Sequence, residues 1–175
     1  MVYHRATIVC LDVQYAASSA NAAAVLFESW TDAHSARVVT LTVSPIQPYE
    51  SGAFYKRELP CLLAILATIP EPLEAIVIDG YVYLDHQMRP GLGARLYEAL
   101  EGQIPVIGVA KTAFNGAPSL PVLRGQSKRA LLVSSIGVEV SAAAADVARM
   151  HGAHRIPTLL KAVDAAARGL NLNAT

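Results

Sequence analysis

The chain has 175 residues, of which 53% are hydrophobic and 16% are charged, and its formal net charge is zero. This composition excludes a disordered chain, and the length predicts a single folded domain over residues 1–175. The zero net charge argues against a protein that coats nucleic acid non-specifically, although a local basic groove is compatible with it. No run reaches the roughly 18 apolar residues of a membrane span, and charge appears too early for a signal peptide, so we expect a cytoplasmic protein.

Short apolar runs rich in β-branched residues predict four strands in the first half of the chain. They cover Ala6–Gln14, Ala22–Phe27, Arg37–Val43 and Ala75–Asp79. The turn-like residues 17–21 separate the first two runs, and the third follows closely. The first three strands are therefore expected to form an antiparallel meander.

Helices are predicted between and after these strands. Ala53–Thr68 has apolar residues at helical spacing, so a helix is expected that either starts at Pro60 or is kinked there. Later helices are expected at Gly93–Glu101, at Ser141–His151 with Ser141 as N-cap, and at Thr158–Arg168 with Thr158 as N-cap and Gly169 as its stop.

Two further apolar runs, Val106–Ala110 and Ala130–Ser134, predict a fifth and a sixth strand. The residues between them, 112–125, are rich in Pro, Gly, Ser and Asn and are expected to be irregular. Three strands followed by alternating helices and strands predict an α/β fold, a mixed sheet with helices on its faces. This is the element order of a ribonuclease H-like core.

Three carboxylates occupy informative positions in these elements. Asp12 lies near the end of the first strand, Glu58 in or beside the first helix, and Asp79 at the end of the fourth strand. Taken singly, each has an ordinary structural explanation: Asp12 can bond a turn, and Glu58 can pair with Lys56 or Arg57. Taken together, they can form one cluster whose repulsion a Mg²⁺ or Mn²⁺ ion would offset. Such a cluster is suited to phosphodiester hydrolysis.

Several short motifs occur in the order of one known nuclease family. They are Leu11–Tyr15 (LDVQY), Pro48–Gly52 (PYESG), Tyr55–Glu58 (YKRE), Val77–Gly80 (VIDG), Ile107–Lys111 (IGVAK) and His154–Pro157 (HRIP). By this ordered set the chain, from Ile8 to about Leu160, resembles endonuclease V, a ribonuclease H-like nuclease that acts on deoxyinosine in DNA and inosine in RNA. The resemblance implies a Mg²⁺- or Mn²⁺-dependent endonuclease that binds DNA or RNA.

The resemblance also implies a role for each matching residue. Asp12, Glu58 and Asp79 would bind the metal, and Lys111 would stabilise negative charge near the scissile phosphate. Tyr49 would belong to a loop that wedges into the duplex. Gly52 and Gly108 would allow close approach of the backbone.

The loop after Asp79 holds the candidate for the family's histidine. His86 keeps that histidine's spacing to Gly91, but the loop before it is one residue longer, so Asp85 is the alternative. Tyr81 and Tyr83 begin the same loop, and two roles are predicted for them. They stack on a base, or they pack the loop against the domain.

Basic residues supply further candidate contacts to nucleic acid. Arg89 lies in the loop after the fourth strand, and His154 lies in the closing motif. Arg124, Lys128 and Arg129 form a local basic cluster, which either contacts phosphates or is an ordinary solvated loop.

The chain also departs from the family pattern. Glu50 and Ser51 replace a hydrophobic residue and a proline of the wedge loop, and the segment after Lys111 is shorter than in typical members. These departures leave two alternatives open. One is a catalytically weak or inactive relative that binds nucleic acid, and the other is a nuclease with a different DNA or RNA substrate.

Overall fold

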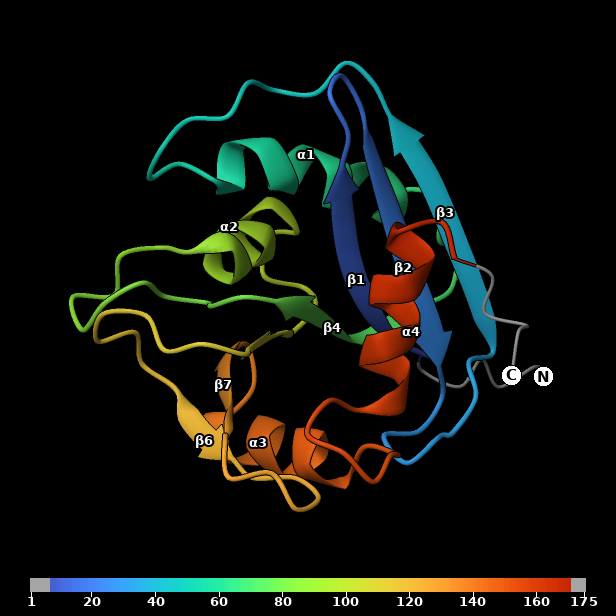
Figure 1. The fold of residues 1–175 in the computed structure, drawn as a ribbon. Coiled ribbons are helices and arrows are strands. Elements are labelled where there is room, and N and C mark those ends of the chain that lie inside the picture. Colours follow the sequence, from blue (N-terminus) through green and yellow to red (C-terminus); the bar gives the residue numbers. More distant parts are fainter. Residues whose placement is uncertain (1–6, 171–175) are drawn as a thin grey trace.

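The computed structural model describes residues 7–170, whose centre is a single mixed β-sheet. Its seven strands are β1 (Thr7–Tyr15), β2 (Ala20–Phe27), β3 (Arg37–Val43), β4 (Leu73–Asp79), β5 (Val106–Ala110), β6 (Leu120–Val122) and β7 (Leu131–Ile136). They lie in the order β3-β2-β1-β4-β5-β7-β6 (Figure 1). The three central strands, β1, β4 and β5, are parallel, whereas both edges of the sheet are antiparallel.

Most strands form where the apolar runs predicted them. The predicted meander is confirmed, because β1 pairs with β2 and β2 pairs with β3, both antiparallel. Ala6, the first residue of the predicted first strand, lies outside the described residues. The expectation that residues 112–125 are irregular is wrong in part, because they contain β6, which pairs with β7 at the edge of the sheet. β6 has only three residues, and its middle residue, Pro121, has a low strand propensity, so the sequence does not predict this strand. Proline is nevertheless tolerated in a strand at the edge of a sheet.

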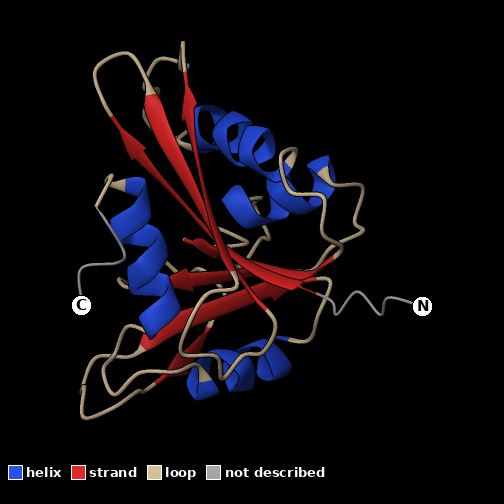
Figure 2. Cartoon of the chain, turned by 90° about the vertical axis from the view of Figure 1, so that its right-hand side faces the viewer, coloured by secondary structure: helices blue, strands red, loops and turns tan. Residues whose placement is uncertain are grey.

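Helices cover both faces of the sheet (Figure 2). Two apolar clusters define these faces. One joins alternate residues of β1 and β4, such as Val9 and Ile76, to α1 (Tyr55–Leu66) and α2 (Leu92–Ala99). The other joins Cys10 and Val77 to α3 (Val140–Arg149) and α4 (Thr158–Ala167). None of the helices in residues 7–170 is long and apolar enough to span a membrane.

The helix ends differ from the predicted caps. α1 starts at Tyr55 and continues through Pro60, so the predicted start at that proline is wrong. Glu139 and Pro157 precede α3 and α4, and neither helix has a side-chain cap, so the predicted caps are also wrong. Thr158 instead lies within 2.9 Å of His151 Nδ1 through its hydroxyl. Gly169 ends α4 with a φ of 75°, as predicted.

Candidate active site

The register of the parallel strands places two acids side by side. Leu11 of β1 is aligned with Ile78 of β4, so Asp12 and Asp79, the next residues, are neighbours at the carboxyl end of β4. Asp79 is in turn aligned with Val109 of β5, two residues before Lys111. The Lys111 ammonium lies 2.8 Å from Asp79 Oδ2.

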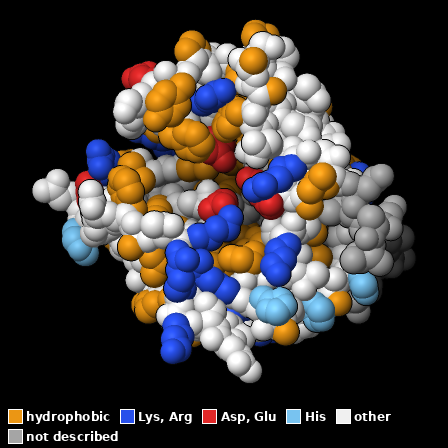
Figure 3. All heavy atoms as spheres, viewed as in Figure 1, with side chains coloured by type: hydrophobic (Ala, Val, Ile, Leu, Met, Phe, Trp, Pro, Cys, Tyr) orange, Lys and Arg blue, Asp and Glu red, His pale blue; other side chains and the backbone are white. Residues whose placement is uncertain are grey.

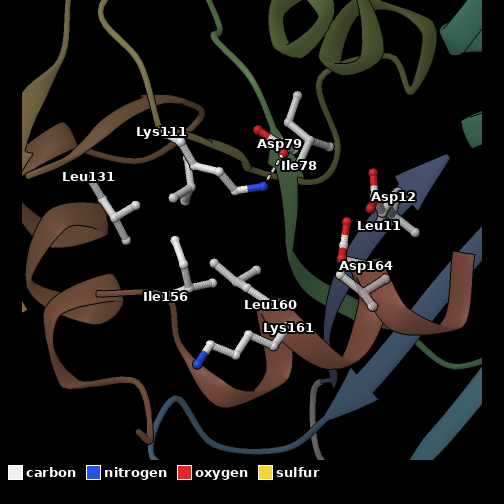
Figure 4. Close-up of a pocket in the computed structure, with 12 residues that line it drawn as sticks. Leu11, Asp12, Ile78, Asp79, Lys111, Leu131, Ile156, Leu160, Lys161 and Asp164 are labelled. Carbon is white, nitrogen blue, oxygen red and sulfur yellow. Dashed lines mark hydrogen bonds and ion pairs between the residues drawn. The ribbon is translucent and has the colours of Figure 1, made fainter. Parts of the chain in front are cut away.

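A fourth acid, Asp164, joins this group from α4. α4 packs on β1 and β2, on the face of the sheet from which Asp12 and Asp79 project. Figure 4 shows the carboxylates of Asp12 and Asp164 close together and Lys111 reaching Asp79 from the other side. Sequence reasoning missed Asp164. The available signal was that it is the one acid in the apolar helix Thr158–Ala167.

These residues surround a cavity of about 150 Å³. Its apolar walls come from the strands and from the start of α4, and they are Leu11, Ile78, Val109, Leu131, Ile156, Leu160 and Val163. Its polar groups are Asp12, Asp79, Lys111, Lys161 and Asp164. In the space-filling view, acidic side chains lie at the bottom of a hollow, and Lys and Arg side chains gather around it (Figure 3).

Glu58, the third predicted acid, comes from α1 and is buried, with 7% of its surface exposed. Its pKa is raised to about 8, mainly by burial and also by the charges of Asp12 and Asp79. Asp12 has its pKa raised to about 6, mainly by burial and also by Asp79 and Asp164, although a hydrogen bond from Val13 N–H opposes the rise. The charges of Asp79 and Asp164 thus act on Asp12, and those of Asp12 and Asp79 act on Glu58.

Two basic side chains partly compensate this negative charge. Burial lowers the pKa of Lys111, but the hydrogen bond and the charge of Asp79 outweigh burial, so the net pKa is raised. Arg168, one turn along α4, lies 3.1 Å from Asp164 Oδ1. The raised pKa of Lys111 keeps this side chain positively charged beside Asp79.

The donor set can be compared with the requirements of a divalent ion. No group of three or more His, Cys, Asp or Glu side chains within residues 7–170 is already arranged to hold a metal ion. The acids nevertheless supply only oxygen donors, and negative neighbours raise the pKa values of Asp12 and Glu58. A hard divalent cation would offset that repulsion, so these residues fit Mg²⁺ or Mn²⁺ in chemical type.

The loop after β4 does not bring His86 or Asp85 to the cavity lining. His86 is exposed beside Gly116, where an added Cβ would lie 3.0 Å from its ring. Asp85 accepts hydrogen bonds from the backbone N–H groups of Gln87 and Arg89, at 3.0 and 3.1 Å, and its carboxylate also pairs with Arg89 Nε. Asp85 and Arg89 thus stabilise their own turn, and the role of His86 stays a prediction.

Tyr81 packs the loop against the domain. Its ring is 9% exposed, lies 6.4 Å from the ring of Phe114, and its hydroxyl donates to the carbonyl of Thr112 at 2.7 Å. Of the two roles predicted for it, the structure favours packing, because a buried ring has no free face for a base. The contact joins the loop that follows Asp79 to the residue that follows Lys111.

The remaining candidates lie at the surface. Tyr49, in the loop between β3 and α1, is 65% exposed, and His154 is also exposed. Gly52 has a φ of 77° and open space around it, so its backbone conformation explains the glycine, and the expected close approach of nucleic acid to its backbone stays a prediction. At Gly108 the expectation is confirmed, since an added Cβ would lie 2.5 Å from the carbonyl oxygen of Gly80.

The predicted basic cluster does not form. Lys128 and Arg129 are exposed, but Arg124 is 5% exposed and its guanidinium faces inward. It donates to the backbone carbonyls of Ala148, Met150, Gly152, His154 and Arg155. Arg124 is therefore neither a phosphate contact nor part of a solvated loop, so both predictions are wrong for this residue. It holds the loop between α3 and α4 in place.

The strand order and the placement of the acids define the class of fold. A mixed sheet with three parallel central strands, an antiparallel meander on one edge and acids at the carboxyl end of β4 is a ribonuclease H-like fold. The chain belongs to the endonuclease V family, whose model matches residues 2–151.

Individual relatives agree with this assignment. Endonuclease V of Streptomyces avermitilis is 34% identical over 149 residues, which cover 73% of this chain and 64% of the relative. Endonuclease V of Rhodospirillum centenum is 30% identical over 158 residues, which cover 78% and 64%. The chain therefore matches less than two thirds of the length of these curated relatives.

Solved structures share the fold. The S. avermitilis enzyme has a TM-score of 0.70 at 30% identity, covering 95% of this chain and 81% of that one. Human ENDOV has a TM-score of 0.76 at 21% identity, covering 95% and 84%. Ciona intestinalis endonuclease V, solved with a 23mer DNA containing an inosine, has a TM-score of 0.78 at 17% identity, covering 93% and 84%.

Proposed function

We propose that this chain is a Mg²⁺- or Mn²⁺-dependent endonuclease that hydrolyses a phosphodiester bond near inosine or deoxyinosine. The observation that carries the proposal is the convergence of Asp12, Asp79 and Asp164 with Lys111 around one open cavity, in a chain of the endonuclease V family. The buried Glu58 lies within electrostatic reach of Asp12 and Asp79. With this activity we also propose a role in DNA repair or RNA processing, in the cytoplasm.

Asp12, Asp79 and Asp164 would hold the metal directly, with Glu58 completing the site from α1. The bound metal would activate water and stabilise charge on the leaving oxygen. Since the pKa of Glu58 is about 8 and that of Asp12 about 6, metal binding near neutral pH requires Glu58 to release its proton. Metal binding should therefore strengthen as the pH rises toward 8.

Lys111 supplies a positive charge on the opposite side of the cavity from Asp12 and Asp164 (Figure 4). Its ammonium, 2.8 Å from Asp79, is placed to stabilise negative charge on a phosphate bound at the acids. Two side chains hold the backbone at this position by hydrogen bonds. The guanidinium of Arg155 donates to the backbone carbonyl of Lys111, and the hydroxyl of Tyr81 donates to the backbone carbonyl of Thr112.

The loop before α1 is the candidate contact to the modified base. Tyr49 is 65% exposed and Phe54 is 49% exposed, so two aromatic rings project near the start of α1. Exposed rings can stack on or wedge between bases, and each such contact is worth about 1–3 kcal/mol. Glu50 pairs with Lys56 at 2.8 Å, which reduces its repulsion of phosphates.

A cleavage screen tests the proposal. Purified protein is incubated with Mg²⁺ or Mn²⁺ and with inosine-containing DNA, inosine-containing RNA, and matched strands without inosine. We expect cleavage of an inosine strand, abolished by Asp79→Ala and kept by Asp146→Ala, which alters a partly exposed acid of α3 that is not in the cavity lining. No cleavage of any strand at any metal concentration would refute the proposal, and binding without cleavage would favour the inactive relative.

A further inference from the structure

A guanidinium and a tyrosine form a stacked pair beside the acids. The Arg57 guanidinium carbon lies 4.1 Å from the centre of the Tyr15 ring, a geometry of cation–π attraction. Tyr15 is the last residue of β1, and Arg57 precedes Glu58 in α1. The ring of Phe54 contacts Tyr15 edge-on at 6.1 Å, which links the pair to the exposed loop before α1.

One polar atom of each side chain in this pair has no partner in the protein. Within residues 7–170, Arg57 Nε and the Tyr15 hydroxyl are both buried and lack a hydrogen-bond partner. The adjacent Lys56, in contrast, is paired with Glu50. Buried polar groups without partners are costly, and a planar guanidinium held flat on a ring is preorganised to bind an anion.

The pair also lies within the electrostatic reach of the acid site. Burial raises the pKa of Tyr15, and the charges of Glu58 and Asp12 raise it further. Those acids repel any phosphate that approaches the cavity. A strand passing over the acids therefore needs positive charge on more than the Lys111 side.

We propose that Arg57, held by Tyr15, binds a backbone phosphate that flanks the scissile one on the same nucleic-acid strand. The inference rests on the proposed nuclease function. It assigns the guanidinium fork to the phosphate oxygens and the Tyr15 ring to fixing its plane. Lys111 and Arg57 would then contact consecutive parts of one strand on two sides of the acids.

The test compares strands in which one phosphate at a time is replaced by a neutral methylphosphonate. Binding of an inosine-containing strand is measured by fluorescence anisotropy with Ca²⁺ in place of Mg²⁺. We expect one flanking methylphosphonate to weaken binding by the wild-type protein on the order of tenfold. Arg57→Gln should bind the unmodified strand about as weakly, and the same methylphosphonate should cost it nothing more. Its plot of log K against log salt should be shallower by about 0.7–0.9.

Two further variants separate phosphate binding from general effects. Arg95→Gln is the matched control, because Arg95 lies over Tyr55 at 3.8 Å and has a buried Nε without a partner, as Arg57 does, but it belongs to α2 and is not next to Glu58 in the chain. Arg95→Gln should keep the tenfold difference in affinity between the unmodified strand and the strand with the flanking methylphosphonate. Tyr15→Leu keeps the charge of Arg57 but removes its platform, and it should lose most of the discrimination, as Arg57→Gln does.

The outcomes distinguish this inference from the proposed function. If the protein cleaves an inosine strand but Arg57→Gln discriminates at every linkage like the wild type, the phosphate site is refuted and the nuclease stands. If no strand is cleaved but discrimination depends on Arg57, the nuclease is refuted and the phosphate site stands. Equal loss of discrimination in Arg95→Gln would also refute a specific site at Arg57.

Discussion

Replacement of Glu58 by glutamine should stabilise the metal-free protein at high pH. The pKa of Glu58 is raised from 4.5 to about 8, mainly by burial and also by the charges of Asp12 and Asp79, so the folded protein keeps this proton over a pH range in which the unfolded chain has lost it. The folded state then binds more protons than the unfolded state, and stability falls as the pH rises from about 4.5 to about 8. At about 1.4 kcal/mol per pH unit, the span of about 3.5 units gives an upper limit near 5 kcal/mol. Relaxation around the buried charge reduces this to about 2–4 kcal/mol.

Urea unfolding in EDTA at pH 5.5 and pH 8.5 measures the effect. Wild type should lose about 1–3 kcal/mol more than Glu58→Gln between the two values, because about one pH unit of the effect lies below pH 5.5 and because glutamine has the same shape and does not ionise. Glu74→Gln, which alters an exposed acid of β4, should behave like wild type. Asp12, with its pKa raised to about 6, titrates near the lower end of this range and is present in all three proteins. Parallel pH profiles for wild type and Glu58→Gln would refute the claim that Glu58 is an electrostatically strained acid.

Three other substitutions test parts of the site and its support. Lys111→Met should lower the single-turnover cleavage rate about 10²–10³-fold, because the charge next to the phosphate is lost. It should not weaken Mn²⁺ binding, because Asp79 loses a competing cation, and weaker Mn²⁺ binding in a calorimetric titration would contradict this. Arg124→Met should lower the free energy of unfolding in urea by about 3–5 kcal/mol, because it leaves buried carbonyls unpaired. The salt dependence of strand binding should not change, and a shallower slope would restore Arg124 as a phosphate contact. Gly108→Ala should destabilise by about 1–3 kcal/mol in thermal unfolding, since the methyl group would lie 2.5 Å from Gly80 O; an unchanged melting temperature would refute the close approach.

The parts of the fold and site that sequence predicts are those with local causes. Asp12 and Asp79 stand out because each interrupts or ends an apolar β-branched run, and the structure aligns them through Leu11 and Ile78. The meander follows from short links between strands. The stop at Gly169 follows from the backbone freedom of glycine.

The parts that sequence misses depend on distant contacts. Asp164 lies in an Ala-rich helix, and nothing nearby in the chain shows that α4 crosses over β1. Arg124 reads as a surface charge because the carbonyls that bind it belong to residues 148–155, far along the chain. Thr158 reads as a cap because its partner, the ring of His151, is fixed only by the folded loop.

Metal binding is the most direct test of the claim that the four acids form one catalytic centre. Mn²⁺ is titrated into the protein by calorimetry at pH 6.5 and pH 8. We expect a saturable site that is lost in Asp79→Asn. It should be about tenfold tighter at pH 8, because the proton of Glu58 must leave before the metal binds. Absence of a binding heat at both pH values, or a site that survives Asp79→Asn unchanged, would contradict it.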